Sequence, residues 1–195
     1  MEDYVYIDLM RNKKFLHYFK LYSSIFVFSF IISIIICLEY TNVSNGAMYI
    51  LKNYTPLGNG NFDMISILAN NFLISIAFLY YLSSKESRFK NFLSKFFFLK
   101  MGLIGGLLIS TVIIKYNLVV ALSMIVPHGI IEIPTIIYAF SIGWVLLELK
   151  ENRQSKMRKE FIYISGIIFI LLSISAYVEV YVTPNICEML LSYYY

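Results

Sequence analysis

Five apolar runs of about twenty residues, separated by short polar segments, constrain this chain more than any other feature. A helix of roughly 20 apolar residues is long enough to cross the hydrocarbon core of a bilayer. Because there is no water in that core, a crossing segment must satisfy its own backbone hydrogen bonds, as an α-helix does. We therefore predict an all-α, polytopic transmembrane helix bundle. The predicted spans are Leu21–Leu38, Ile65–Leu82, Phe96–Ile114, Ile130–Leu147 and Phe161–Val182.

Composition supports a single integral membrane domain over residues 1–195, with the lipid bilayer as its surroundings. The chain is 59% hydrophobic and 14% charged, and its mean hydropathy of +0.71 lies outside the range of soluble domains. Its net charge of +4 is spread between the apolar runs, so a nucleic-acid-binding patch is not expected. Cys37 and Cys187 show no metal-ligand spacing. We interpret them as unpaired, with a disulfide between them as the alternative.

The basic residues predict the orientation of the bundle. The N-terminal segment, the second-to-third connection with the start of the third span, and the fourth-to-fifth connection contain 14 of the 16 lysines and arginines. Only Lys52 and Lys115 lie in the alternate segments. Because basic residues gather on the cytoplasmic side, residues 1–20 are predicted to be a cytoplasmic segment and residues 183–195 an extracytoplasmic tail. Residues 4–18 are expected to form either an interfacial amphipathic helix or an irregular polar arm.

The fourth span is preceded by an interruption. Leu118–Val126 is apolar but only nine residues long, too short to cross, so it is predicted to be a half-helix before the fourth span. Pro127, Gly129 and Pro134 follow it and are predicted to break the helix.

Several polar residues fall at membrane depth, toward the predicted outer side. Ionisable side chains inside spans normally face a protein interior or a cavity, and they often mark functional sites. An imidazole and carboxylates together can bind a divalent ion or relay protons, so the metal question stays open. The asparagines have an alternative role as hydrogen-bonding contacts between helices. The predicted polar intramembrane site comprises His128, Glu132, Glu179, Asn70 and Asn71.

No catalytic motif accompanies these residues. The chain has no His-Glu-x-x-His, no Gly-x-Ser-x-Gly and no phosphate-binding glycine loop. Gly102, Gly105 and Gly106 lie inside a span, where they allow close helix approach. We therefore expect a protein that is not an enzyme and needs no cofactor; an intramembrane metal-dependent hydrolase is the weakest alternative.

Three segments carry a resemblance to a known family. Residues 127–134 read Pro-His-Gly-Ile-Ile-Glu-Ile-Pro, which resembles the Pro-His-Gly-x-x-Glu-hydrophobic-Pro signature of the stage II sporulation protein M family. The Asn-Asn pair in residues 68–71 and the Ala-x-x-Glu-x-x-x-Thr-Pro pattern of residues 176–184 are weaker similarities in the same order. The bulkier residues 138–144, where the family has a run of small residues, indicate a diverged member.

The resemblance implies a polytopic protein of the cell membrane with no established enzymatic role. The family's namesake acts in engulfment during sporulation with two peptidoglycan-degrading partners. We therefore expect a non-enzymatic membrane subunit or scaffold of a multiprotein assembly, with membrane or extracytoplasmic protein partners. Other members occur in circular-bacteriocin gene clusters. The alternatives are accordingly an immunity or export factor that works with an ABC transporter or against a hydrophobic peptide, and a small transporter with a polar outer-leaflet site.

Overall fold

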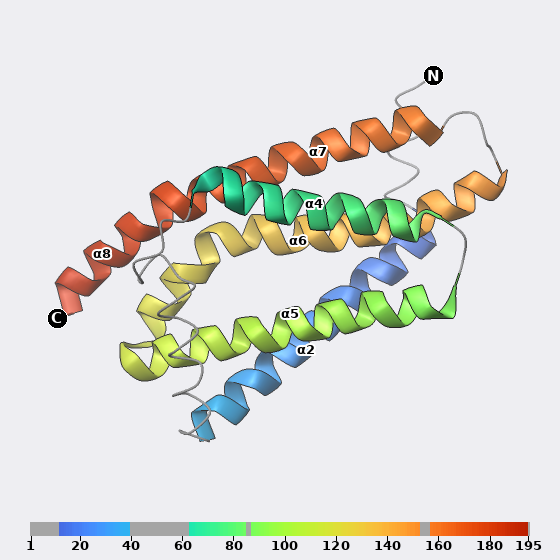
Figure 1. Ribbon diagram of the computed structural model, residues 1–195. Helices are drawn as coiled ribbons and strands as arrows, with labels where there is room; N and C mark the ends of the chain where they lie inside the picture. Colours follow the sequence, from blue (N-terminus) through green and yellow to red (C-terminus); the bar gives the residue numbers. More distant parts are fainter. Residues whose placement is uncertain (1–11, 40–62, 85–86, 153–156, 195) are drawn as a thin grey trace.

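The computed structural model describes residues 12–39, 63–84, 87–152 and 157–194, and every regular element in them is helical. Five of the helical stretches are long and apolar enough to cross a membrane, which confirms the predicted all-α fold and the five candidate spans. Figure 1 shows them lying side by side in an elongated bundle. The elements are α2 (Lys13–Glu39), α4 (Met64–Leu82), α5 (Arg88–Lys115), α6 (Leu118–Asn152), α7 (Met157–Tyr177), the π-helix η1 (Val178–Val182) and α8 (Thr183–Tyr194).

Each predicted span lies inside one helical stretch, and most helices extend beyond the predicted bounds. The N-terminal segment is helical from Lys13 onward because α2 starts there. Residues 1–11 and the first-to-second connection over 40–62 lie outside the described residues. Cys37 and Cys187 are buried and unpaired, in agreement with the favoured interpretation.

The predicted break before the fourth span is wrong. α6 runs for 35 residues from Leu118 to Asn152 with both Pro127 and Pro134 inside it, so there is no separate half-helix. Each proline removes one N–H from the helical ladder, which bends a helix without ending it when the flanking turns are well packed. Figure 1 shows the bend: the N-terminal part of α6 is steeply inclined to the rest of the helix.

The helix does not end with the predicted fifth span, because it continues beyond Val182 as α8. Pro184 has no N–H for the α-helical bond to Val180. The ladder changes register just before it, and the N–H of Thr183 donates to the carbonyl of Val178. This i→i−5 bonding defines the π-helix η1, which carries the chain past the proline. α8 then packs against α6.

The helices are arranged around α6, which packs against α2, α4, α5, α7 and α8. α2 and α5 form a close pair on one side of it. A Cβ at Gly102 would lie 2.4 Å from the carbonyl oxygen of Phe26, and one at Gly106 would lie 2.4 Å from that of Phe30. The two backbones therefore approach as closely as they do only because glycine stands at these two positions, as the sequence predicted for the glycines of this span.

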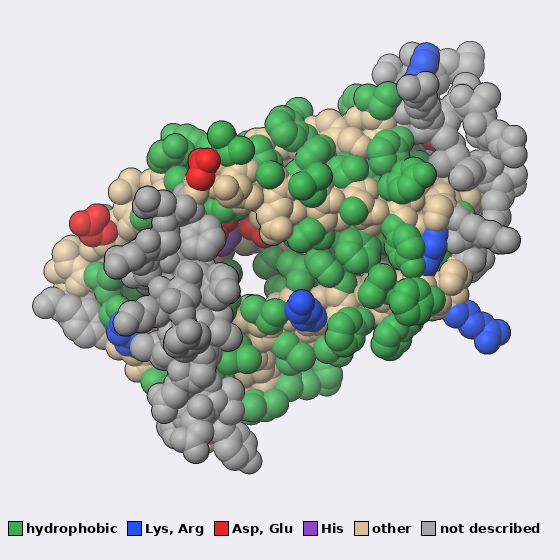
Figure 2. Space-filling view, viewed as in Figure 1, with side chains coloured by type: hydrophobic (Ala, Val, Ile, Leu, Met, Phe, Trp, Pro, Cys, Tyr) green, Lys and Arg blue, Asp and Glu red, His purple; other side chains and the backbone are tan. Residues whose placement is uncertain are grey.

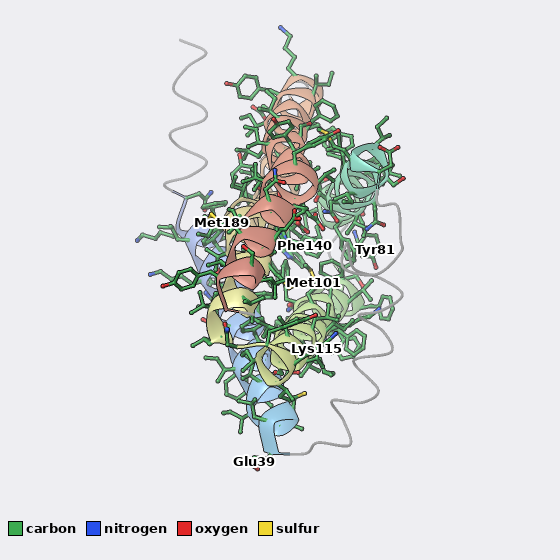
Figure 3. All side chains as sticks on the ribbon, turned by 90° about the vertical axis from the view of Figure 1, so that its left-hand side faces the viewer. Glu39, Tyr81, Met101, Lys115, Phe140 and Met189 are labelled. Atoms are coloured by element: carbon green, nitrogen blue, oxygen red, sulfur yellow. The ribbon has the colours of Figure 1, made fainter. Side chains whose placement is uncertain are left out.

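One end of the bundle has an aromatic core. Phe140 of α6 is fully buried and lies among the surrounding helices when the bundle is viewed along its length (Figure 3). Beside it, Trp144 Nε1 donates to the hydroxyl of Tyr22 at 2.6 Å. That hydroxyl donates to Ser94 Oγ at 2.9 Å, and Ser94 donates to the carbonyl of Asn91 at 3.1 Å. We call Tyr22, Ser94 and Trp144 the aromatic network; it joins α2, α5 and α6.

Candidate functional site

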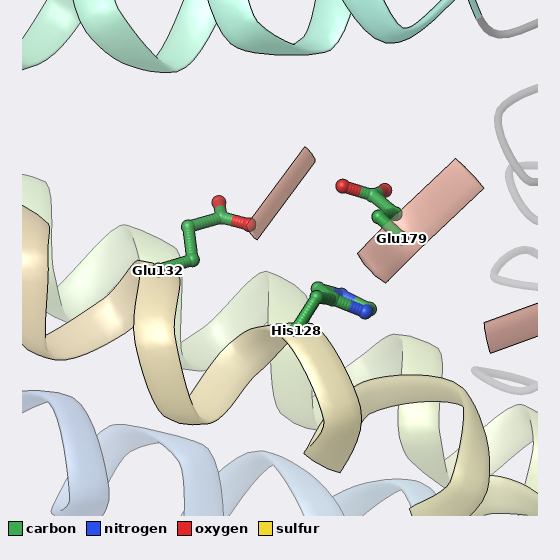
Figure 4. A group of neighbouring side chains, drawn as sticks. All are labelled: His128, Glu132 and Glu179. Atoms are coloured by element: carbon green, nitrogen blue, oxygen red, sulfur yellow. The ribbon is translucent and has the colours of Figure 1, made fainter. Parts of the chain in front are cut away.

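Three ionisable side chains from two distant segments meet inside the bundle. One ligand atom each of His128, Glu132 and Glu179 lies within 4.8 Å of the others, and Figure 4 shows the three side chains converging. We call these residues the ionisable trio. All three are half-buried and lie in helices long and apolar enough to span a membrane. The structure thus brings together three of the five polar residues singled out in the sequence.

His128 and Glu132 are placed by α6. They are four residues apart in a continuous helix, a spacing that puts both side chains on one face. The hydroxyl of Ser175 on α7 donates to the carbonyl of His128 at 3.2 Å. This bond ties α7 to the turn of α6 that carries the imidazole.

Glu179, the third member of the trio, lies in the π-helix η1. Single π turns within α-helices occur frequently at functional sites, because the wider turn changes the direction of the residues that follow. Four residues later, the buried Thr183 brings its Oγ1 to 3.4 Å from His128 Nδ1. One turn of irregular helix thus supplies both a carboxylate and a hydroxyl to the site.

The two predicted asparagines have different positions. The side chain of Asn71 hydrogen-bonds to Glu132, so Asn71 belongs to the site. Asn70 is exposed, and its Nδ2 lies 3.5 Å from Asn71 Oδ1. Asn70 is therefore at the margin of the site and does not contact the trio directly.

Pro127, Gly129 and Pro134 shape the helix that carries the site and supply no polar side chain. Gly129 is buried, yet a Cβ there would meet only Ile125 and Ile133 of its own helix, at 3.3 and 3.7 Å. Its role is therefore unlike that of Gly102, where a neighbouring backbone occupies the space.

The site concentrates like charge. The charged group that acts on Glu132 is Glu179, and its described polar partner is Asn71. Two carboxylate charges no more than 4.8 Å apart repel each other by at least roughly 3 kcal/mol at an effective dielectric of about 20. Such a pair is stabilised by a cation or a shared proton, so cation binding and proton exchange are the chemistry that the trio supports.

The surface is hollowed next to these groups. Figure 2 shows a depression between α4 and α5, with acidic and histidine side chains visible at its wall. α4 packs against α6 and α7, while α5 packs against α2 and α6, which leaves the two helices apart on this face.

Two features of the site were not predicted from the sequence. Thr183 was not assigned to the site, although its spacing of four residues from Glu179 was a signal that both face the same neighbour. The π turn was not predicted, and Pro184 was its available signal. The aromatic network was also missed, because its members are ordinary apolar-run residues far apart in the sequence.

Comparison with known proteins gives one family. A family model described as Stage II sporulation protein M matches residues 22–184, a range that includes the whole trio, Asn71 and Thr183. An uncharacterised protein from Methanocaldococcus jannaschii is 31% identical over 182 residues, which cover 88% of this chain and 94% of that protein. No solved structure matches the chain.

Proposed function

The chain belongs to the stage II sporulation protein M family and is a membrane protein, and from this premise we propose that it is a non-enzymatic subunit of a multiprotein assembly in the cell membrane. Its partners are membrane or extracytoplasmic proteins, as in a sporulation or engulfment complex. The observation that carries the proposal lies on α4. Its exposed face presents a polar side chain whose hydrogen bonds lipid cannot satisfy.

Asn70 is that group. It is exposed, and it lies roughly 9 Å along the axis from the first residue of α4. Among the described residues, its Nδ2 has one hydrogen-bonding contact, at 3.5 Å from Asn71 Oδ1. Amides at membrane depth stabilise contacts with neighbouring helices. Leu73, one turn further on and 66% exposed, offers apolar surface beside it, so a transmembrane helix of a partner fits this face.

The charged end of the bundle supports the proposed orientation of the subunit. α2, α5 and α7 all begin at the same end of the bundle, as Figure 1 shows. The first turns there contain Lys13, Arg88 and Lys159. The positive-inside rule assigns this end to the cytoplasm, which puts the ionisable trio and α8 toward the outer leaflet, where extracytoplasmic partners would reach them.

Site-specific photocrosslinking tests the proposal. A photoreactive residue at Leu73 of α4 should give a discrete protein adduct in native membranes, and mass spectrometry of the adduct identifies the partner. The matched control is Ile170 of α7, which is 59% exposed. Asn70→Leu should weaken the Leu73 adduct. Absence of an adduct at Leu73, or equal labelling at both positions, would contradict a partner on α4.

A second function has a specific observation in its favour. The trio gathers ionisable groups inside the membrane domain, as transporters do at their substrate sites. In this alternative the protein is an immunity or export factor against a hydrophobic peptide, working with an ABC transporter, or a small transporter. Glu132→Gln and Glu179→Gln should then abolish peptide resistance while the exposed control Glu188→Gln keeps it. Unchanged resistance in both trio variants excludes this alternative.

The neighbouring genes discriminate between the two functions at little effort. Sporulation genes beside the coding sequence favour the assembly subunit. A small precursor-peptide gene beside an ATP-binding transporter subunit favours the immunity or export factor.

A further inference from the structure

We propose that His128, Glu132 and Glu179 bind one divalent transition-metal ion of the Zn²⁺ class inside the membrane domain. The site lies within a single chain, so it is independent of the partner proposed above. It rests on the arrangement of the ligand atoms, on the balance of charge and on the groups that hold the ligands.

The ligand atoms are already close to the spacing that a metal needs. Zn²⁺ binds imidazole nitrogen and carboxylate oxygen at about 2.1 Å, which puts tetrahedral ligand atoms about 3.4 Å apart. In the structure one ligand atom of each trio residue lies within 4.8 Å of the others. Side-chain torsions can close the remaining distance, which is at most roughly 1.4 Å. The ligands come from α6 and η1, two packed segments that hold their relative position.

Charge explains why an ion belongs there. Two carboxylates and a neutral imidazole carry a charge of −2, which a divalent cation neutralises. Isolated charges in a low-dielectric interior are strongly unfavourable, whereas a metal ion is often the largest local charge of such a site and compensates its carboxylates. The acidic neighbour of Glu132 is Glu179, and its other described partner is the neutral Asn71. A divalent cation would therefore balance the charge of the three ligands.

Neighbouring polar groups orient the ligands as they do in known metal sites. A metal-binding histidine usually donates its second ring N–H to an oxygen, which fixes the ring and leaves the other nitrogen for the metal. Thr183 Oγ1 lies 3.4 Å from His128 Nδ1, so Nε2 is the nitrogen left for the ion. Asn71 hydrogen-bonds to Glu132 in the same way.

The ligand types select the class of metal. Mg²⁺ and Ca²⁺ prefer six or more oxygen ligands, and an imidazole serves them poorly. One imidazole with two carboxylates suits Zn²⁺ and its first-row neighbours. Three protein ligands leave a fourth position for water or a polar group of a bound molecule.

Metal binding by the purified, full-length protein in detergent tests the proposal. The protein is stripped with a chelator and dialysed against buffered ZnCl₂, and bound zinc is counted by mass spectrometry. We expect one Zn²⁺ per chain that excess Mg²⁺ does not displace. Glu179→Gln should weaken binding by roughly 100-fold or more, and Thr183→Val by about 10-fold, since partners of metal ligands typically contribute 10- to 100-fold.

The controls separate this site from adventitious binding. Glu188→Gln removes an exposed carboxylate on α8, and His17→Ala removes the other histidine of the chain; both should bind zinc as the original protein does. Should Glu179→Gln fail to fold, Co²⁺ added to the unaltered protein should give the intense visible absorption of a four- or five-coordinate ion. Zinc below one per chain, displacement by Mg²⁺, undiminished binding in folded Glu179→Gln or the weak spectrum of octahedral Co²⁺ would each overturn the proposal.

Discussion

Two polar clusters among the described helices are built on opposite principles. The aromatic network consists of neutral groups in a closed chain of bonds, from Trp144 Nε1 through the Tyr22 hydroxyl to Ser94 and a backbone carbonyl. All three of its side chains are buried, with exposed fractions of 5% or less. A network of this kind, with its donors satisfied, rigidifies a core and specifies its packing.

The ionisable trio has the reverse properties. Its members are half-buried rather than buried, two of them are acidic, and they lie close to one another. The helices that carry it are irregular, with prolines in α6 and a π turn in η1. A closed neutral network stabilises a fold, whereas ionisable groups inside a membrane domain often mark functional sites, which agrees with the metal site proposed for the trio.

The largest effect should come from filling the α2–α5 contact beside the aromatic network. In Gly102→Ala the new Cβ would lie 2.0 Å from Ser29 Oγ and 2.4 Å from the Phe26 carbonyl oxygen. Because backbone must move, the free energy of unfolding should fall by about 3 kcal/mol, measured by detergent-induced unfolding in mixed micelles. Gly129→Ala, next to the trio, meets only side chains of its own helix and should change it by less than about 0.5 kcal/mol. Equal losses in the two variants would remove the distinction between the two regions.

The next largest effect should come from opening the aromatic network. Tyr22→Phe keeps the ring that stacks on Phe98 at 4.8 Å but leaves the buried indole N–H of Trp144 without its acceptor. An unsatisfied buried donor costs about 1–3 kcal/mol, so the same unfolding measurement should show a loss of about 1–2 kcal/mol. Adding Trp144→Phe removes the unpaired donor, and the double variant should lose less than the sum of the two single variants. Additive losses would mean that the bond itself contributes little.

Sequence reasoning worked where a single segment carries the signal. Apolar runs predicted the helices, and the ionisable residues within those runs indicated His128, Glu132 and Glu179 as site residues. It failed where the outcome depends on neighbours. Pro127 was predicted to end a helix, but the packing of α6 against other helices keeps it continuous. The position of Glu179 next to α6 depends on a change of hydrogen-bond register at η1. Pro184 is the one local sequence feature that indicates this change.

A smaller effect is expected from the polar bond between α2 and α5. Ser33 Oγ donates to the carbonyl of Leu103 at 2.7 Å. Interhelical hydrogen bonds in membrane proteins contribute about 0.6 kcal/mol on average, and Ser33→Ala should lower the free energy of unfolding by that amount. Ser173→Ala is the matched control, because its hydroxyl donates within its own helix to the carbonyl of Phe169 and should have no measurable effect. A loss of 2 kcal/mol or more at Ser33 would mean that this bond, and not the glycines, holds the pair together.

The smallest effect on stability should come from substitutions in the trio. Unlike the substitutions above, these should not lower the free energy of unfolding. Glu132→Gln or Glu179→Gln removes one of two like charges that lie close together, so in metal-free detergent the free energy of unfolding should stay the same or rise slightly. Zinc should stabilise the original protein and not these variants, because an ion that binds only the folded state raises its stability. A loss comparable to that of Tyr22→Phe in metal-free buffer would show that the carboxylates are structural, like the aromatic network. Stability that is preserved, together with the loss of zinc binding, would instead make the trio the part of the bundle that is kept for a ligand.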